Sequence, residues 1–547
     1  MTNKKFNIHD QDVFRLLQYA DRTKNISNLA VEDIIVPFPG FDEVKFDEKI
    51  WNVIRKSKYG QSYTLYIHTL RVCVELLLQF EHTNEKKYYD KAREIIFSWL
   101  KFSESDTDNK MVWYDHTTAN RTQVLIHFIY VSEKIDEEIE YNLFANTLRK
   151  HADVLMNDEI HNLNNHGLMM DRSLIILGNV LEEERYKQKG IFRAVNTFWF
   201  SFSHNGIHLE NSPQYHNMVL RMYEEIEEYL NTRNESLGKP IVEYMKLAKE
   251  YSSLIVRPNR RIASIGDSSN GFKKIKKKYQ SVYDREAGIS IIQHENPVPF
   301  FLTFICGYST KVHKHKDDLS ITLNYNKEDF FVDPGPYNYS KHKIRKYMTS
   351  KEAHSSFYLT DFDYSIKESN RYTRKISFEN FVENDDFWMI KGYHHDYNGS
   401  HAKLSRTIIT FKDSNLIILL DDVKTSVTKH KLKFTQNFNL DKSVTIKQNS
   451  DSLTLTNNKQ ALVLKQFNKF NEFNVIDGDK EKPIALNTTG FGKATETHQL
   501  QYKFETIDKS VFITAIYDEE KVENIDIKRE SNQLFVTYND SKYNIIV

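Results

Sequence analysis

S-T-K-V-H-K-H-K-D-D-L-S-I, residues 309–321, opens the stretch of this chain that says most about its fold and its chemistry. The stretch continues to His354 and also contains Asp333, His313 and His315, among apolar runs of strand character. Because side chains alternate along an extended strand, we expect His313 and His315 to lie on one face. Imidazoles and carboxylates are used both to bind zinc and to transfer protons. The competing interpretation is a charged, solvated loop that contains histidines by chance.

Upstream of this stretch, the first half of the chain is predicted to be helical. Apolar residues recur with the helical period of about 3.6 from residue 67 to residue 78. Stripes with the same period follow at 88–99, 122–135, 140–156, 173–181, 215–230 and 244–254. Short polar connectors such as 81–86 suit antiparallel helix pairs. We therefore expect stacked helix pairs in a bundle, a solenoid or a toroid.

The second half of the chain changes to the period of a strand. Leu453 and Leu455 alternate with polar residues, and an apolar run returns at 461–464 after an Asn-Asn turn. Further short strands are expected at 376–382, 387–393, 407–411 and 416–420. This pattern predicts a large antiparallel sheet assembly of sandwich type. The join is placed at 267–284, where the run F-K-K-I-K-K-K-Y is interpreted as a solvated linker, with a path for a polyanion as the alternative.

Length and composition limit the class of protein. At 547 residues the chain is too long for one ordinary domain, so two large units are expected. Lys plus Arg and Asp plus Glu both total 75, and this zero net charge supplies no global field to recruit nucleic acid or a membrane surface. Cys73 and Cys306 are the only cysteines, which excludes a disulfide framework and fits a reducing compartment. No secretory signal or bilayer-spanning segment is visible, so a cytoplasmic location is predicted.

Three segments of the helical half carry further chemistry. H-N-L-N-N-H-G-L contains Asn165 and His166, and G-I-H-L-E-N-S-P-Q-Y-H-N-M contains Tyr215 and His216. M-V-W-Y-D-H-T-T-A-N-R adds Arg121. Each segment alone is equally consistent with helix caps and core aromatics. Together they supply an amide, imidazoles, a phenol and a guanidinium near helix boundaries.

With these motifs the chain resembles the heparinase II/III-type polysaccharide lyases. The resemblance covers N-N-H-G, E-N-S-P-Q-Y-H, H-x-H-x-D-x-L-S, V-D-P-G-x-Y-x-Y and R-x-Y-x-x-S-x-x-A-H, in that order along both halves. It implies a multidomain α+β protein, with an N-terminal (α/α) toroid over residues 1–275 and a C-terminal antiparallel β-sandwich over residues 276–547. That division agrees with the change of period.

The resemblance also implies a reaction. In β-elimination the C5 proton of a uronic acid leaves and the glycosidic bond at C4 breaks, so the enzyme would be a carbon–oxygen lyase. Asn165, with His166 beside it, is implied to stabilise the sugar carboxylate as negative charge develops. Tyr215 matches the catalytic tyrosine, which protonates the leaving oxygen and, for one C5 epimer, also removes the proton. His313 and His166 are the candidate bases for the other epimer.

The resemblance implies substrate contacts by Arg121, His216 and Tyr347. The expected partner is an acidic polysaccharide or oligosaccharide, with no nucleic acid and no membrane. We expect the helical and sheet portions to meet across a groove that brings Tyr215 and His313 to one sugar ring. The sequence leaves open which uronan is bound, whether cleavage is endo or exo, and the oligomeric state.

A metal site is also implied. His315, Asp333 and His354 match the metal ligands of these lyases in order and approximate spacing. Two imidazoles and one carboxylate suit Zn²⁺. The ion would brace the loops that carry His313 and would not itself be the catalyst.

Two alternatives to a lyase stay open. A uronate C5-epimerase shares the removal of the C5 proton but returns a proton to the opposite face. A non-catalytic glycan-binding protein of a surface-polysaccharide pathway would keep only the binding. The second alternative is disfavoured because the set Asn165, His166, Tyr215 and His313 is complete. The missing export signal favours the processing of imported oligosaccharides or a role in a surface-polysaccharide pathway.

Overall fold

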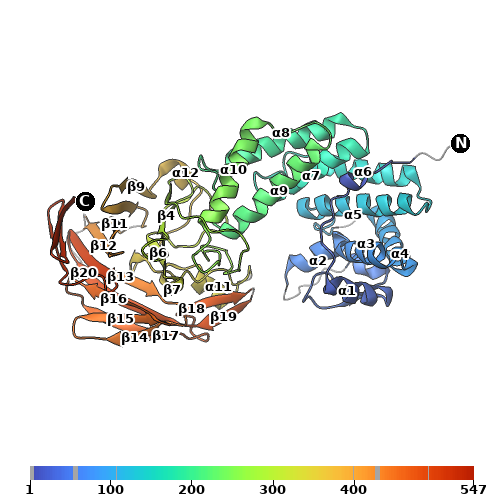
Figure 1. Cartoon of the computed structure of the whole chain (residues 1–547). Coiled ribbons are helices and arrows are strands. Elements are labelled where there is room, and N and C mark those ends of the chain that lie inside the picture. Colours follow the sequence, from blue (N-terminus) through green and yellow to red (C-terminus); the bar gives the residue numbers. More distant parts are fainter. Residues whose placement is uncertain are drawn as a thin grey trace. The chain divides into compact units, whose positions relative to one another are not determined.

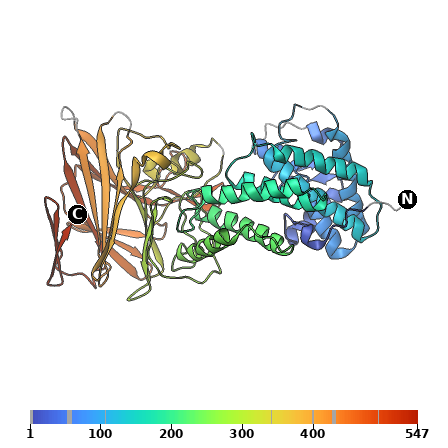
Figure 2. The same ribbon diagram turned by 90° about the horizontal axis from the view of Figure 1, so that it is seen from above.

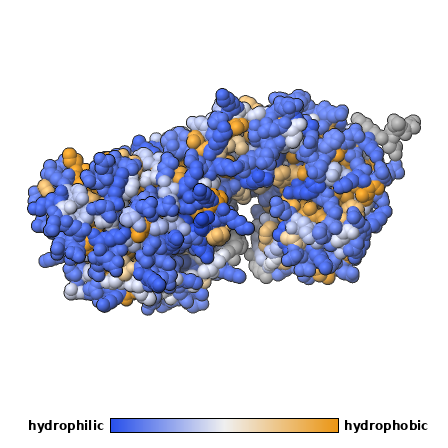
Figure 3. Space-filling model, viewed as in Figure 1, coloured by the Kyte–Doolittle hydropathy of each residue, from blue (hydrophilic) through white to orange (hydrophobic). Residues whose placement is uncertain are grey.

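The computed structural model describes residues 5–52, 59–105, 108–339, 341–397, 400–425, 431–490 and 492–547. Contacts divide the chain into two compact units, one of Met1–Ser201 with Arg221–Val242 and one of Phe202–Leu220 with Glu243–Val547. We call them the helical unit and the sheet unit (Figure 1). Hydrophilic residues cover most of the face of each unit that Figure 3 shows. The predicted domain division at residue 275 stays a prediction.

The helical unit is built from consecutive helices that pack pairwise. In chain order they are α1 (Asp21–Val31), α2 (Gln61–His68), α3 (Arg71–Thr83), α4 (Lys86–Ser103), α5 (Asp115–Lys134), α6 (Tyr141–Met156), α7 (Asn165–Val180) and α8 (Glu184–Ser201). Two further helices, α9 (Pro213–Asn231) and α10 (Lys239–Leu254), have residues in both units. The unit also contains the 3-10 helices η1 (Asp10–Asp12) and η2 (Glu48–Asn52) and the strands β1 (Ile34–Ile35) and β2 (Val44–Lys45). The predicted helical first half is confirmed.

Two details of the helical unit differ from the sequence prediction. The apolar face predicted from residue 67 to residue 78 is divided between α2 and α3, because Leu70 adopts a left-handed φ of 57° and ends the helical path. Leu70 is fully buried there, so its side-chain burial offsets the backbone strain. Helix α8 was not predicted. Its buried face mixes Gly190, Arg193 and Thr197 with apolar residues, and the apolar stripe is therefore weak.

The sheet unit contains five antiparallel sheets within the described residues (Figures 1 and 2). The eight-stranded sheet has the order β14 (Thr445–Gln448), β15 (Ser452–Asn457), β16 (Gln460–Gln466), β21 (Ser510–Tyr517), β12 (Ile417–Thr425), β11 (Ala402–Phe411), β10 (Phe387–His394) and β9 (Ile376–Glu383). The five-stranded sheet has the order β3 (Val282–Asp284), β4 (Ile289–His294), β5 (Phe300–Ile305), β6 (Ser320–Tyr325) and β7 (Glu328–Phe331). The four-stranded sheet has the order β17 (Glu472–Asp477), β20 (His498–Thr506), β13 (Leu432–Asn439) and β8 (Phe357–Leu359).

Two small sheets and three short helices complete the sheet unit. The small sheets are β18 (Leu486–Gly490) with β19 (Lys493–Glu496), and β22 (Asp526–Glu530), β23 (Gln533–Tyr538) and β24 (Ser541–Ile546). The helices are α11 (Lys343–Met348), η3 (Lys351–Ala353) and α12 (Asn370–Thr373). All six strands predicted between residues 376 and 464 are present, and the sheet-rich second half is confirmed.

One apolar core joins the three large sheets. Phe304 of β5, Ile390 of β10 and Phe434 of β13 belong to the same buried cluster, and each is at most 1% exposed. A fully buried ion pair crosses this core, in which the Arg406 guanidinium contacts Asp421 at 2.7 Å. Arg406 also donates to the Leu319 carbonyl oxygen at 2.7 Å and thereby fixes the end of the loop that contains His313 and His315. The core therefore positions the histidine loop.

The segment predicted as a solvated linker is only partly solvated. Lys277, within the run F-K-K-I-K-K-K-Y, is half-buried. The Lys277 amine donates to the Leu254 carbonyl oxygen at 2.8 Å, and burial lowers its pKa to about 7. The solvated-linker interpretation of the lysine run is therefore wrong for Lys277, whose amine bonds to the end of α10 and to Gln293 of β4.

Candidate active site

The candidate active site of the sheet unit is built around a tyrosine and a histidine in ring contact. Tyr215 lies in the first turn of α9, and His313 lies in the loop between β5 and β6. Their rings stack with centroids 3.6 Å apart. The Tyr215 hydroxyl also shares a hydrogen bond of 2.8 Å with the Tyr339 hydroxyl. The structure thus brings together the predicted acid and one of the predicted bases.

The loop that carries His313 is held by a buried ion cluster. The Lys314 amine contacts the carboxylates of Asp317 and Asp318, the latter at 3.1 Å, and all three residues are buried. Asp318 also accepts a hydrogen bond of 3.0 Å from the Tyr364 hydroxyl. Because buried charges persist only when they are paired, these residues fix the loop in one conformation. The alternative of a solvated loop is wrong.

The two histidines do not share the face of a strand, contrary to the prediction. Residues 311–319 form turns, and His313 has a left-handed φ of 56°. His313 Nδ1 and His315 Nε2 nevertheless both donate to the Asp267 carboxylate, each at 3.0 Å. Their convergence is set by a shared acceptor and not by strand alternation.

Asp267 is a buried carboxylate held by three cationic or polar side chains. Besides the two histidines, Arg345 of α11 donates to both of its oxygens, with Nη2 at 3.0 Å. Burial alone would raise the pKa of Asp267, but the hydrogen bonds from His313 and His315 and the charges around it hold the pKa well below its usual range. The negative charge of Asp267 therefore faces the Nδ1 side of the His313 ring.

Gly266 and Asn211 fix the position of the Asp267 turn against the loop that carries His313. Gly266 has a φ of 54°, and a Cβ there would lie 2.4 Å from the Asn211 carbonyl oxygen and 2.8 Å from that of His313. Only glycine fits such a position. The Asn211 amide donates to the carbonyl oxygens of Thr310 and Val312 at 2.8 and 2.9 Å. The segment before α9 is therefore bonded directly to the histidine loop.

The surroundings of Tyr215 favour its neutral form. Burial raises the pKa of Tyr215 above its usual value near 10, the carboxylates of Asp267 and Glu210 act in the same direction, and the hydrogen bond from Tyr339 acts against them. Glu210 Oε2 also lies 3.7 Å from His313 Nε2. At neutral pH the phenol therefore carries its proton, as an acid catalyst requires.

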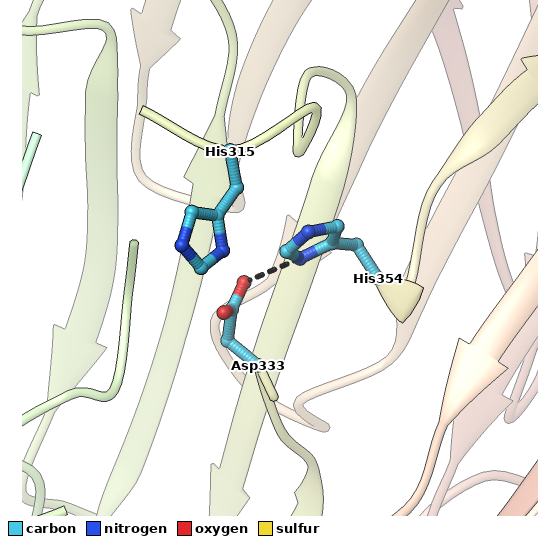
Figure 4. Close-up of side chains that lie close together, drawn as sticks. All are labelled: His315, Asp333 and His354. Atoms are coloured by element: carbon cyan, nitrogen blue, oxygen red, sulfur yellow. Dashed lines mark hydrogen bonds and ion pairs between the residues drawn. The ribbon is translucent and has the colours of Figure 1, made fainter. Parts of the chain in front are cut away.

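The three predicted metal ligands lie together in the sheet unit (Figure 4). One ligand atom from each of His315, Asp333 and His354 lies within 4.8 Å of the others, and all three residues are buried. His354 Nδ1 donates to Asp333 at 2.9 Å. His315 Nδ1 and His354 Nε2 are buried without a hydrogen-bond partner in the described part of the chain. Two orphaned imidazole nitrogens beside a carboxylate fit a metal ion.

Asn165 and His166 lie in the helical unit, at the start of α7. The Asn164 side chain caps this helix by accepting from the His166 and Gly167 backbone N–H groups. His166 Nδ1 lies 3.5 Å from the Asp115 carboxylate, and both Asn165 and His166 are half-buried. The predicted meeting of these two residues with Tyr215 stays a prediction.

Comparison with known proteins identifies the family. Residues 4–287 match the family description "Heparinase II/III N-terminus", and residues 279–539 match "Heparinase II/III-like, C-terminal". The chain belongs to the heparinase II/III family. Heparinase-family enzymes are polysaccharide lyases, so the protein is a carbon–oxygen lyase that acts on polysaccharides. The resemblance drawn from the motifs is thereby confirmed.

Solved structures of lyases share the fold. Heparinase III matches with a TM-score of 0.77 and 13% identity over 99% of this chain and 94% of that chain. Heparan sulfate lyase HepC from Pedobacter heparinus matches with a TM-score of 0.71 and 14% identity over 98% and 90%. A chondroitinase AC lyase matches with a TM-score of 0.61 and 9% identity over 98% and 88%. No curated protein matches the sequence.

The three predicted substrate contacts of this heparinase II/III family member have internal partners. Arg121 is fully buried, donates to the His151 ring and to backbone oxygens, and lies over the Trp99 ring. His216 is 1% exposed, and both of its ring nitrogens bond to backbone groups. The Tyr347 hydroxyl bonds to the Ala485 N–H and to a glutamine amide, each at 2.8 Å. These contacts give each residue a structural role, and contact with substrate stays a prediction.

Three residues of the site were missed in the sequence. Tyr339 closes the V-D-P-G-x-Y-x-Y motif and Arg345 opens the R-x-Y motif, so both were quoted without a role. Asp267 stands at the start of the predicted join between the two halves and was given no role there. A buried carboxylate in a polar turn has no sequence signal of its own, because only its distant partners reveal it.

Within the described ranges, no helix combines the length and the apolar composition that a membrane span requires.

Proposed function

We propose that this lyase cleaves an acidic, uronate-containing polysaccharide or oligosaccharide, with Tyr215 and His313 as its proton-transfer pair. The single observation that carries this assignment is the ring contact of 3.6 Å between them, with the Asp267 carboxylate behind His313. The similar structures are a heparinase, a heparan sulfate lyase and a chondroitinase, which supports a glycosaminoglycan-like substrate.

The residues divide the work of β-elimination between them. Asp267 holds the proton of His313 on Nδ1, which leaves Nε2 as the atom that accepts the C5 proton. The C5–H electrons form the C4–C5 double bond, and the C4–O electrons leave with the glycosidic oxygen. That oxygen takes the Tyr215 proton, and Tyr339 stabilises the resulting phenolate by donating its hydroxyl hydrogen. For the other C5 epimer, Tyr215 acts as both base and acid.

The sugar carboxylate needs neutral or cationic donors as negative charge develops. We assign this role to Asn165 and His166, in agreement with the order of the family motifs. Asn165 is the first residue of α7, where the positive end of the helix dipole favours an anion. We assign a structural role to the three buried residues Arg121, His216 and Tyr347.

The architecture that we propose is a toroid of (α/α) pairs followed by a β-sandwich. The consecutive packing of α3 with α4, α5 with α6 and α7 with α8 supports the toroid. The shared core of the five-, eight- and four-stranded sheets supports the sandwich. Both assignments agree with the architecture that the motif resemblance implies.

We further propose that His315, Asp333 and His354 hold Zn²⁺. Bound there, the ion would fix the loops that carry His313 and His354 and supply no step of the reaction. Zinc is expected to raise the Tm of chelator-treated protein, because binding to the folded state alone stabilises it. Differential scanning calorimetry with ZnCl₂ and with EDTA measures the effect. The His354→Ala variant should lose it, and a zinc-independent Tm in the parent would contradict the assignment.

A substrate panel tests the proposed function. Heparosan, hyaluronan, chondroitin and alginate should be compared, and at least one is expected to give the ultraviolet absorbance of an unsaturated uronate. Tyr215→Phe, tested on the same panel, serves as the inactive control. Deuterium incorporation at C5 without chain cleavage would indicate an epimerase instead. Absence of product from every polymer, with folded and zinc-loaded protein, would contradict the assignment.

A further inference from the structure

A second, strongly basic groove lies on the sheet unit and shares no residue with the site around Tyr215. Its volume is about 570 Å³, and it lies along β10, β11 and β12. Six cationic side chains line it, namely Arg285, Lys391, Lys403, Lys424, Lys509 and Arg529. Among the described residues, only two anionic side chains line it, Glu379 and Asp422. The groove therefore has an excess of four positive side-chain charges in a chain whose net charge is zero.

Five of the six cations fall into two groups, and the sixth, Arg285, donates to the Ser377 hydroxyl at 3.0 Å. Lys391 pairs with Glu379 at 3.2 Å, and Arg529 pairs with Asp422 at 2.7 Å. Lys403, Lys424 and Lys509 are exposed and have no ion pair within the described ranges. The paired cations are thus neutralised within the protein. The three unpaired lysines form a basic strip that an external anion can contact.

The open part of the groove contains an unfavourable strand pair. Lys403 of β11 lies directly opposite Lys424 of β12 in the antiparallel register. Like charges in this position destabilise a sheet. Their field also reaches His395, whose pKa is lowered by burial and by the charges of both lysines. An anion bound beside the two lysines would relieve their repulsion. An opposed lysine pair is therefore expected at an anion-binding site.

We propose that this groove binds an acidic glycan strand as a site separate from the catalytic residues. Tyr393 and Ser405 lie between the cations, where they offer an apolar ring and a hydroxyl to a sugar. Single-stranded nucleic acid would need a series of aromatic platforms, and the part of the groove that the structure describes offers Tyr393 and His395 alone. The inference rests on the proposed function, because a substrate polymer held here raises the local concentration of its own cleavable bonds.

The test compares two double variants of the whole protein in the Tyr215→Phe background, in which the glycan is not cleaved. Lys403→Ser with Lys424→Ser removes two charges from the groove. Lys447→Ser with Lys459→Ser removes two exposed charges around β14 and β15, at the other end of the same sheet. Affinity for size-fractionated heparin is measured by calorimetry at 50 and 200 mM NaCl.

The groove variant is expected to bind heparin about tenfold more weakly, with a smaller dependence on salt, because two exposed charge contacts are lost. The matched variant should bind as the background protein does. Equal weakening in both variants, or in neither, would overturn the proposal. Tighter binding to an oligonucleotide of equal charge than to heparin would overturn the glycan assignment.

Thermal stability and turnover provide further readouts. Without glycan and at low salt, Lys424→Thr should raise the Tm, because the opposed charges are removed. Heparin should raise the Tm of the parent and have a smaller effect on this variant. With Tyr215 restored, the groove variant should have a higher KM for long polymers and an unchanged kcat for short oligosaccharides. If no polymer is cleaved but heparin binding still depends on Lys403 and Lys424, the proposed function fails and the groove proposal stands. If the KM of the groove variant for long polymers is unchanged, the groove proposal fails.

Discussion

Tyr215→Phe is expected to lower kcat by about 10³-fold, the range of a lost general acid. The substitution removes only the hydroxyl, so the ring keeps its stack with His313. The hydroxyl contacts Tyr339, an exposed side chain, and its loss should leave the free energy of unfolding nearly unchanged. Single-turnover kinetics at the absorbance of the unsaturated product measure the effect.

The pH profile of kcat/KM should identify the role of the phenol. The pKa of Tyr215 is raised above its usual value near 10, so the phenol is protonated throughout the neutral range. An acid must carry its proton, and the loss of kcat/KM on the alkaline side should therefore follow this raised pKa. If Tyr215 served instead as the base in the free enzyme, kcat/KM would increase toward the same pKa.

Two other tyrosines are matched controls for Tyr215. Tyr347→Phe breaks buried hydrogen bonds to Ala485 and a glutamine, and should cost about 1–2 kcal/mol of stability with kcat retained. Tyr339→Phe removes the partner of the Tyr215 hydroxyl and should lower kcat by about 10- to 100-fold, the effect of one hydrogen bond to a charged group. Comparable kcat losses for Tyr215→Phe and Tyr347→Phe would exclude a direct chemical role for Tyr215.

Periodic elements of the fold could be predicted from the sequence, and exceptions to the period could not. The stripe at 140–156 corresponds closely to α6 (Tyr141–Met156), because one face of that helix is apolar. The break at Leu70 lies inside an apolar stripe, where no turn residue marks it. Helix α8 was missed because its buried face contains Gly190 and Arg193, which lower the apolar signal.

The candidate site could likewise be predicted from the sequence only in part. Motif resemblance located Tyr215 and His313, and it also grouped His315, Asp333 and His354, which the structure places together. It did not indicate that Lys314 would be buried, because a lysine in a charged run is ordinarily solvated. Only tertiary packing makes a charged loop rigid, through ion pairs whose partners the sequence does not mark as buried.

Asp267→Asn is expected to lower kcat by about 10³-fold with little change in KM. The carboxylate touches no reacting atom, but it keeps the His313 proton on Nδ1. An amide can present an N–H to this nitrogen, which moves the ring proton to Nε2 and removes the base. Losses of about this size follow when a catalytic imidazole is held in the wrong tautomer. Ring ¹⁵N chemical shifts of His313 report the tautomer directly.

Asp318→Asn is the matched control for this variant. Asp318 is also a buried carboxylate, it belongs to the histidine loop, and it accepts from Lys314 and Tyr364. Its loss should cost comparable stability and lower kcat far less than Asp267→Asn does, because Asp318 holds the loop but does not contact His313. Equal kcat losses in the two variants would show that Asp267 acts only through the fold.

The proposed zinc site provides a second measurement on Asp267. His315 Nε2 donates to this carboxylate, which leaves the orphaned Nδ1 free to ligate the metal. Removal of such a carboxylate partner typically weakens metal binding by about 10–100-fold. Asp267→Asn should therefore weaken zinc binding and lower kcat, whereas His354→Ala should act mainly on zinc. Saturating zinc should restore the loop order of Asp267→Asn but not its kcat, since the tautomer of His313 depends on the carboxylate and not on the ion.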